Sequence, residues 1–335
     1  MGQRASQSGE SYGRSSSLPE SIESHPPPLS REPDDSSGGR ISGIARFPRR
    51  AVLRLGGQGL LLPSVVSAGL FFLVPLALLL VYSFGSVNLL DYQVYFGWTI
   101  SNYTSIIRSI YVGVMLRSLA LSLGATLACL LIGFPVAYTI ARARGRRQAV
   151  LLVMIMVPFW TSFIVRTYGI YNVISYNGPL DRLLNAIGLV HGQLQSLLFQ
   201  PAGIGIGIVY SYLPLMVLPI YVALERIEPN LLLAASDLGA GPRRVLRRVV
   251  LPLAAPGIVA GCFLVGIPAT GEYTIPAILG GGKAVMYGNV VSDQFLSLGN
   301  YPFGSAIAMA LTVLILAVLL WLRSRAAKVE SRTIR

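Results

Sequence analysis

The stretch of this chain that decides its fold is Leu233–Pro252, which reads LAASDLGAGPRRVLRRVVLP and lies between two strongly apolar segments. Gly239 suits the left-handed position just past a first short helix, and Pro242 suits the first turn of a second one. The stretch therefore predicts two short helices joined by a sharp turn, with a basic run and a closing Leu-Pro pair. A compact helical knob of this kind suits docking to another protein. The alternative is an amphipathic loop that rests on lipid headgroups.

The composition of the chain places it in a membrane. Of its 335 residues, 53% are hydrophobic and 12% are charged, whereas about a quarter of the residues in a soluble domain are charged. The formal net charge is +13, and 22 of the 27 Lys and Arg residues fall in four clusters: the N-terminal tail through Arg54, Arg142–Arg147, Arg226–Arg248 and Arg323–Arg335. Because these clusters occupy alternate gaps between apolar segments, they mark the cytoplasmic side, and nucleic-acid binding is the weaker interpretation.

Six apolar segments are each near or above the roughly 20 residues that a helix needs to cross a bilayer. They are Leu60–Phe84, Val112–Ala141, Ala149–Tyr171, Ala202–Leu224, Ala255–Ile278 and Gly304–Leu322. The sequence thus predicts an all-α polytopic membrane protein with six transmembrane helices and with both termini in the cytoplasm. Residues 1–45 are expected to form a disordered cytoplasmic tail, because they are rich in Ser, Gly and charge. Residues 46–335 are expected to form the membrane domain, with a cytoplasmic loop at 225–254.

The sequence gives little sign of catalytic or nucleotide-binding chemistry. Cys129 and Cys262 both lie in apolar segments, and the two His residues are far apart, so neither a metal site nor a disulfide framework is expected. A phosphate-binding loop needs a Gly five residues before its last Gly and a hydroxyl after its Lys. The run Gly280–Lys283 has Ala277 and Ala284 at these positions and does not meet the pattern.

Two ionisable residues within the expected spans are candidates for a solute path, since buried charges in membranes are costly and rare. They are Arg166 in the third span and Glu272 in the fifth. One interpretation is that they pair with each other or extend to the interface, as Arg117 is expected to do. The other is that the Glu272 carboxylate attracts an amine of a cationic solute. Aromatic faces for cation–π contact would come from Tyr273, Tyr168 and Trp160.

The loop also resembles the permease subunits of binding-protein-dependent ABC importers. Their pattern is EAA, three residues, G, nine residues and I-x-L-P. Here it is matched by Ala234, Ala235, Gly239, Leu251 and Pro252, with Val249 in place of the Ile. The segments PFWTSFIVRTYG (158–169), NGPLDRLL (177–184), GEYTIPAILGG (271–281) and MYGN (286–289) add a similarity to the permeases of spermidine/putrescine importers. One position departs from the pattern, because Leu233 stands where the family has its Glu.

The resemblance implies a MetI-like permease fold in the inner (plasma) membrane and inward transport of a polyamine. It implies no catalytic residue or cofactor in this chain, with ATP used by separate ATPase subunits. The other implied partners are a second similar permease subunit, an extracytoplasmic solute-binding protein and membrane lipid. The ATPase would dock on a surface that includes Ala234, Ala235, Asp237, Gly239, Arg243, Leu251 and Pro252.

Several alternatives stay open at this point. Glu228 or Asp237 could substitute for the missing acid at Leu233, and Arg243, Arg244, Arg247 and Arg248 could support docking or meet anionic lipid. The same machinery could carry ferric ion, a phosphonate or another organic solute. A membrane-embedded enzyme and a membrane scaffold without transport activity are the remaining classes. The enzyme is disfavoured because the spans offer few catalytic side chains beyond Glu272 and Arg166.

Overall fold

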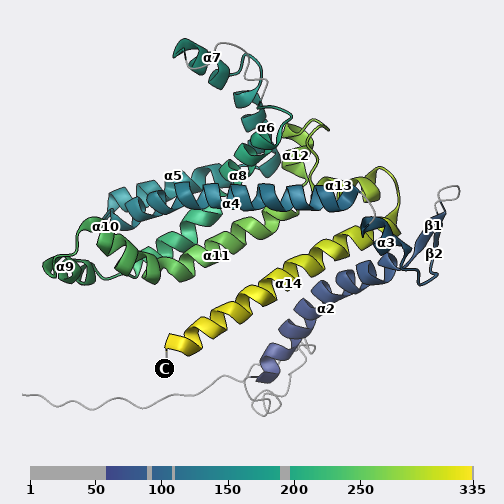
Figure 1. Ribbon diagram of the computed structural model, residues 1–335, viewed down its shortest axis with the longest axis horizontal. Helices are drawn as coiled ribbons and strands as arrows, with labels where there is room; N and C mark the ends of the chain where they lie inside the picture. The colour runs from purple at the N-terminus through teal and green to yellow at the C-terminus, as the bar shows by residue number, and fades with distance from the viewer. Residues whose placement is uncertain (1–57, 89–92, 108–109, 189–196, 334–335) are drawn as a thin grey trace, which may run out of the picture. The chain divides into compact units, whose positions relative to one another are not determined.

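The computed structural model describes residues 58–88, 93–107, 110–188 and 197–333, and these are mostly helical (Figure 1). Five helices are long and apolar enough to cross a membrane, and a sharply bent pair would make six. Four of the expected spans correspond to single helices: α2 (Gln58–Ser83), α4 (Ile110–Arg142), α8 (Pro201–Glu225) and α14 (Tyr301–Thr333). The tail predicted over residues 1–45 lies outside the described residues.

The centre of the protein is formed by α4, α8 and α11 (Leu251–Thr270), which pack against one another (Figure 1). Their close approach depends on glycine. A Cβ atom at Gly257 of α11 would collide with the Pro219 carbonyl oxygen and with Ala223, both of α8. Small residues of this kind let membrane helices approach closely enough to pack backbone against backbone.

The third expected span, Ala149–Tyr171, is not one straight helix and lies in a sharply bent pair of helices. Helix α5 (Arg146–Trp160) is followed by its C-cap, Thr161. The chain bends by 96° between α5 and the segment that holds α6 (Phe163–Ile174) and α7 (Pro179–Ala186). Thr161 has an extended backbone, and its N–H and hydroxyl both donate to the carbonyl oxygen of Pro158. Pro158 in the last turn of α5 cannot donate to the preceding turn, which favours a break here.

The fifth expected span is also divided. Helix α11 ends at Thr270, two residues after Pro268, and a short helix α12 (Thr274–Leu279) begins after Gly271–Tyr273. The expected span Ala255–Ile278 therefore contains a break before α12. Both breaks lie in sequence that is apolar enough to look continuous, because hydropathy does not record where backbone hydrogen bonding is interrupted.

The remaining elements lie at the loops. Helices α3 (Ser101–Ile107) and α13 (Tyr287–Leu296) both contact α14. Strands β1 (Ser86–Asn88) and β2 (Gln93–Tyr95) form an antiparallel pair. Between α8 and α11 come α9 (Pro229–Asp237), α10 (Pro242–Val245) and the π-helical turn η2 (Leu246–Val250). Both cysteines are free, and no cluster of three metal-ligating side chains occurs among the described residues.

Candidate functional site

The loop quoted first folds as two short helices joined by a turn, as the sequence predicts. Gly239 has a φ of +77°, which is the left-handed conformation that favours glycine. Its N–H donates to the Ser236 carbonyl oxygen, and the Ala240 N–H donates to that of Ala235. These two bonds form a Schellman motif that ends α9. Pro242 then occupies the first turn of α10.

The closing Leu-Pro pair begins the next membrane helix. Leu251 and Pro252 begin α11, which continues from α10 through η2, so that Pro242–Thr270 forms one long helical segment. The Leu251 N–H donates to the Leu246 carbonyl oxygen, five residues back. Pro252 has no N–H to offer, and the widened turn before it accommodates this loss. The loop is therefore attached rigidly to α11, without a flexible joint at its end.

Helix α9 is anchored by one side chain and presents the others to solvent. Leu232 is its one buried residue, whereas Ala234 and Asp237 are exposed, and Leu233 is 62% exposed. Ala235 is half-buried, and Gly239 and Arg243 beyond the helix are exposed. Leu233, which replaces the family's acid, thus lies on the free side of the helix and not in the core.

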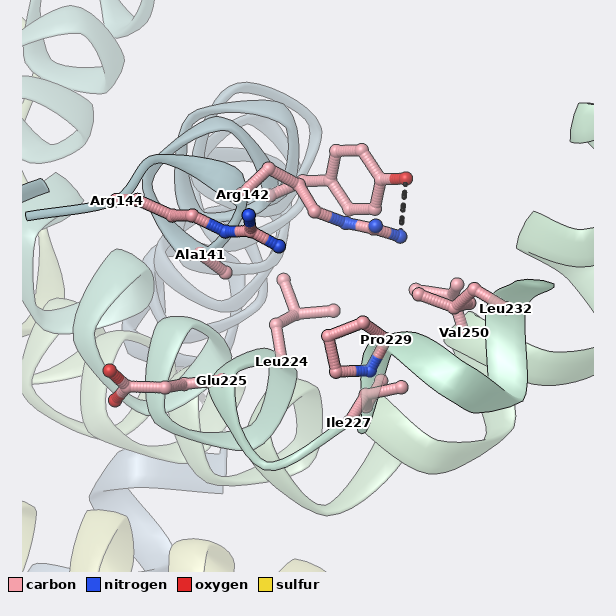
Figure 2. Close-up of a pocket in the computed structure, with 10 residues that line it drawn as sticks. Ala141, Arg142, Arg144, Leu224, Glu225, Ile227, Pro229, Leu232 and Val250 are labelled. Atoms are coloured by element: carbon pink, nitrogen blue, oxygen red, sulfur yellow. Dashed lines mark hydrogen bonds between the residues drawn. The ribbon is translucent and has the colours of Figure 1, made fainter.

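The anchor of α9 lies beside a pocket of about 210 Å³, shown in Figure 2. Leu232 and Pro229 line it together with Leu224 of α8 and Val250 of η2. On the opposite wall, Arg142 of α4 donates to the Tyr138 hydroxyl at 3.1 Å; the other lining residues are Ala141, Arg144, Glu225 and Ile227. The base of α9 thus faces the ends of α4 and α8 and the turn η2 across one pocket.

A polar network joins α5 to the same end of α8. The Gln148 side chain donates to the Tyr221 hydroxyl at 2.9 Å and to the Glu225 carboxylate at 3.1 Å, and Tyr221 donates to Glu225 at 2.6 Å. None of the residues of α5 is buried. This network attaches α5 to the helix that leads into α9, in addition to the partly buried Leu151, Leu152 and Ile155, which pack against the core. Neither Gln148 nor Tyr221 was predicted as a site residue.

A second candidate site lies where both helix breaks meet the middle of α8. Arg166 of α6 is 7% exposed and donates to three carbonyl oxygens: Phe159 at 3.2 Å, Thr161 at 3.0 Å and Ser211 at 3.1 Å. Its guanidinium also lies over the Phe159 ring. Because the carboxyl end of a helix carries partial negative charge, the C-terminus of α5 stabilises this buried cation.

Glu272 has the complementary arrangement at the second break. Its carboxylate accepts the Tyr212 hydroxyl at 2.6 Å and the backbone N–H groups of Thr274 at 2.8 Å and Ile275 at 3.3 Å. The side chain is 7% exposed. The amino end of α12, with its partial positive charge, thus stabilises this buried anion. Ion and solute sites of membrane transporters are also formed at the ends of interrupted helices, where the helix ends face the bound ion or solute; here side chains of the protein occupy both ends.

These bonds exclude the alternative in which Arg166 and Glu272 pair with each other or extend to the interface. Both residues lie in the described part, and each makes its polar contacts with a helix end and with α8. Two neighbouring residues of α8, Ser211 and Tyr212, contact the two charges. Neither residue was predicted. Tyr212 is a polar residue inside an apolar segment, which was a usable signal, whereas Ser211 contacts Arg166 through its main-chain carbonyl, which any residue provides.

The three aromatic residues expected beside Glu272 lie with their rings outward. Trp160 is 77% exposed, and Tyr168 and Tyr273 are about half exposed. None of them takes part in a ring or cation–π contact with another described residue. Tyr273 is adjacent to Glu272 in the chain, and its carbonyl oxygen accepts the Asn289 side chain at 2.8 Å. Their part in a solute path stays a prediction.

Interrupted apolar helices with buried charges at the breaks, together with an exposed helical loop, define a polytopic membrane protein of the transporter class. The family of binding-protein-dependent transport system inner membrane components matches residues 130–329. The chain belongs to this family and is a multi-pass inner membrane permease of the ABC importer type.

Individual relatives agree with this assignment. The chain is 39% identical over 264 residues to the spermidine/putrescine transport system permease protein PotB of Haemophilus influenzae, which covers 79% of this chain and 91% of that protein. Among solved structures, a bacterial ABC transporter involved in alginate import has a TM-score of 0.65 at 16% identity, covering 83% of this chain and 96% of that chain. A second structure, the alginate transporter in complex with an alginate-bound periplasmic protein, has a TM-score of 0.58 at 17% identity, with coverages of 81% and 93%. The structural likeness shows the MetI-like permease fold.

Proposed function

We propose that this chain is the membrane permease subunit of an ATP-driven importer that moves a polyamine of the spermidine or putrescine class inward. The observation that carries the proposal is the identity to the Haemophilus influenzae permease, which extends over most of both chains. The chemistry of the second break agrees with a cationic cargo, because Glu272 is an anion in an apolar part of the chain.

The remaining parts of the machine belong to other chains in this proposal. ATP is hydrolysed by two separate ATPase subunits, since Gly280–Lys283 lacks the residues of a phosphate-binding loop. A second, similar permease completes the membrane part, and an extracytoplasmic binding protein delivers the solute. The ATPase docks on the solvent-exposed side of α9, with Ala234, Asp237 and Gly239 at the contact.

Glu272 is the residue proposed to set the preference for cations along the path. A carboxylate has about four acceptor positions, of which three are filled by Tyr212 and the two backbone N–H groups. A fourth is available to an amine that approaches from the break. Trp160, Tyr168 and Tyr273 add exposed aromatic faces nearby in sequence to the two breaks, and each cation–π contact contributes about 0.5–2 kcal/mol.

The cargo is tested by uptake into proteoliposomes that contain the complete complex and its binding protein. Labelled spermidine and putrescine should accumulate only with ATP. If they do not accumulate while ferric ion, a phosphonate or another organic solute does, the polyamine proposal is wrong although the permease assignment stands.

The docking surface is tested by coupling between ATP hydrolysis and uptake. D237K places a cation on the exposed end of α9, and D293K makes the same change at an exposed position of α13. We expect D237K to reduce uptake per ATP hydrolysed at least tenfold, with little effect from D293K. If D237K and D293K show the same uptake per ATP hydrolysed, α9 is not the docking element. If the unchanged complex shows no uptake of any solute, a membrane scaffold is favoured.

A further inference from the structure

The basic run before α11 has a regular four-residue period that the structure preserves in space. Residues 243–250 read RRVLRRVV. In an ideal α-helix of 3.6 residues per turn, a four-residue repeat drifts around the axis by about 40° per repeat. The segment instead contains the π-helical turn η2 over Leu246–Val250. Because a π turn holds more residues than an α turn, it offsets this drift and keeps the two Arg-Arg pairs on one face.

The two faces of this segment have opposite environments. Val245, Leu246 and Val249 pack against the core cluster of α4, α8 and α11, and Val250 is fully part of it. Arg243, Arg244, Arg247 and Arg248 are all exposed and line one hollow of about 610 Å³. The segment is thus held in place by its apolar face, which presents the four arginines as a fixed group. We call these four residues the arginine patch.

The arginine patch has no internal partner. Within the described residues, none of its guanidinium groups makes a hydrogen bond or an ion pair, unlike Arg142 and Arg166. Its hollow is otherwise lined by Gly239, Gly241 and Pro242, so neither a carboxylate nor a large apolar side chain faces it. Four exposed cations around a hollow without acid call for an anionic ligand with several oxygen acceptors, such as a phosphate.

The position of the arginine patch identifies the source of that phosphate. It occupies the first turns of the helical segment Pro242–Thr270, which is long and apolar enough to span a membrane. The apolar residues of the span begin at Val249, directly after Arg248. Arginines at the end of a span lie at the level of the lipid headgroups. The exposed apolar side chains of the loop, Leu231, Leu233 and Leu238, lie instead on α9 and its end, where a protein partner would contact them.

We infer that the arginine patch is a binding site for the phosphate headgroup of an anionic phospholipid, which holds the α9–α10 loop against the membrane surface. The π turn is the structural feature that assembles the site. In this arrangement α9 and the arginine patch have separate partners, a protein for the first and a lipid for the second. The inference does not depend on the cargo of the transporter.

A matched pair of variants tests this site. R247Q/R248Q removes two adjacent exposed charges from the arginine patch. R146Q/R147Q removes two adjacent exposed charges from the first turn of α5, outside the hollow of the arginine patch. Binding of phosphatidylglycerol and of phosphatidylcholine to the purified full chain is titrated by native mass spectrometry from neutral detergent. R243Q/R244Q repeats the test on the first pair if R247Q/R248Q does not fold.

Each charge near an anionic surface contributes about a fivefold change in affinity. We therefore expect R247Q/R248Q to weaken phosphatidylglycerol binding about 30-fold, with phosphatidylcholine unchanged. R146Q/R147Q should have a smaller effect, because these two arginines do not share one hollow with a second pair and so cannot bind a single phosphate together with it. An equal loss in both variants would overturn the inference in favour of general surface charge. Retained lipid binding with lost ATPase association would make the arginine patch a protein contact. If glycerol phosphate displaces phosphatidylglycerol and binds with the same affinity as the intact lipid, the arginine patch is a site for a soluble anion.

Discussion

Truncation of Glu272 should destabilise the second helix break, and the size of the effect follows from the hydrogen bonds of its carboxylate. E272A leaves the Tyr212 hydroxyl and the N–H groups of Thr274 and Ile275 without their acceptor. A hydrogen bond to a charged group contributes about 1.5–3 kcal/mol to stability. Part of the loss is offset, because E272A also removes the cost of burying the charged carboxylate. We expect E272A to lower the free energy of unfolding by about 4 kcal/mol.

Y212F is the matched single-bond change. It removes the 2.6 Å bond to the Glu272 carboxylate and leaves both backbone N–H donors in place. The expected loss is about 2 kcal/mol. E272Q should fall near Y212F, since its amide oxygen can keep the backbone bonds while the charge that favours the amino end of α12 is lost.

Thermal unfolding of the purified chain measures this series. Cys129 is fully buried in the core, so a thiol-reactive fluorophore reports its exposure when Cys262 is replaced by Ser. Because the unfolding entropy is about 2.1 cal/mol/K per residue, 1 kcal/mol corresponds to about 1.5 °C in Tm for a chain of this size. We expect Tm to fall by about 6 °C in E272A and by about 3 °C in Y212F. If E272A melts within about 2 °C of the unchanged chain, the carboxylate does not hold the break together.

Uptake separates the charge of Glu272 from its structural role. Y212F and E272Q should have similar Tm values, but Y212F keeps the anion and E272Q does not. Polyamine uptake should therefore fall at least tenfold more in E272Q than in Y212F. Equal uptake in the two variants would assign Glu272 to the fold alone.

Three further changes address the other break, the helix packing and the loop. R166K keeps the charge, but a single ammonium cannot reach all the carbonyl oxygens that the guanidinium binds. We therefore expect Tm to fall by about 5 °C. An unchanged Tm would contradict these hydrogen bonds. G257L should prevent recovery of folded, monodisperse protein, because its side chain would collide with the Pro219 carbonyl. G124L should be tolerated, because Gly124 has open space around it. Equal yields of the two variants would argue against the close packing of α11 on α8. L233E should change the free energy of unfolding by less than about 0.5 kcal/mol because the position is exposed. It should tighten ATPase binding by restoring the family's acid. Weaker binding would show that the docking groove accepts Leu.

The loop and the long spans could be predicted from the sequence because their signals are local. Gly239 and Pro242 each restrict their own backbone, so their positions fix the turn and the start of α10. Long apolar runs likewise identify α2, α4, α8 and α14. The π turn could not be predicted in this way, since its cause is the combination of Pro252 with the packing of Val245 and Val249 on other helices.

Which of the prolines would interrupt a helix could not be predicted for a related reason. Pro158 and Pro268 lie near the ends of α5 and α11, but Pro214 and Pro219 lie inside α8, which stays continuous. A proline permits a break, and whether one forms depends on what satisfies the freed backbone groups. At the first break these groups are met by Arg166, and that contact becomes visible only when α6 folds back.

The separation of the two buried charges has a consequence that a direct ion pair would not have. Arg166 is bonded to the end of α5 and to Ser211, and Glu272 is bonded to the start of α12 and to Tyr212. Since Ser211 and Tyr212 are neighbours on α8, a shift of α8 along its axis strains the contacts of both charges together. The same helix leads through Glu225 to the base of α9. Helix α8 therefore links the loop to both helix breaks through one rigid element. Because Arg166 binds the main-chain carbonyl of Ser211, a displacement of α8 should affect the two breaks jointly, whereas a side-chain change such as Y212F acts on the second break.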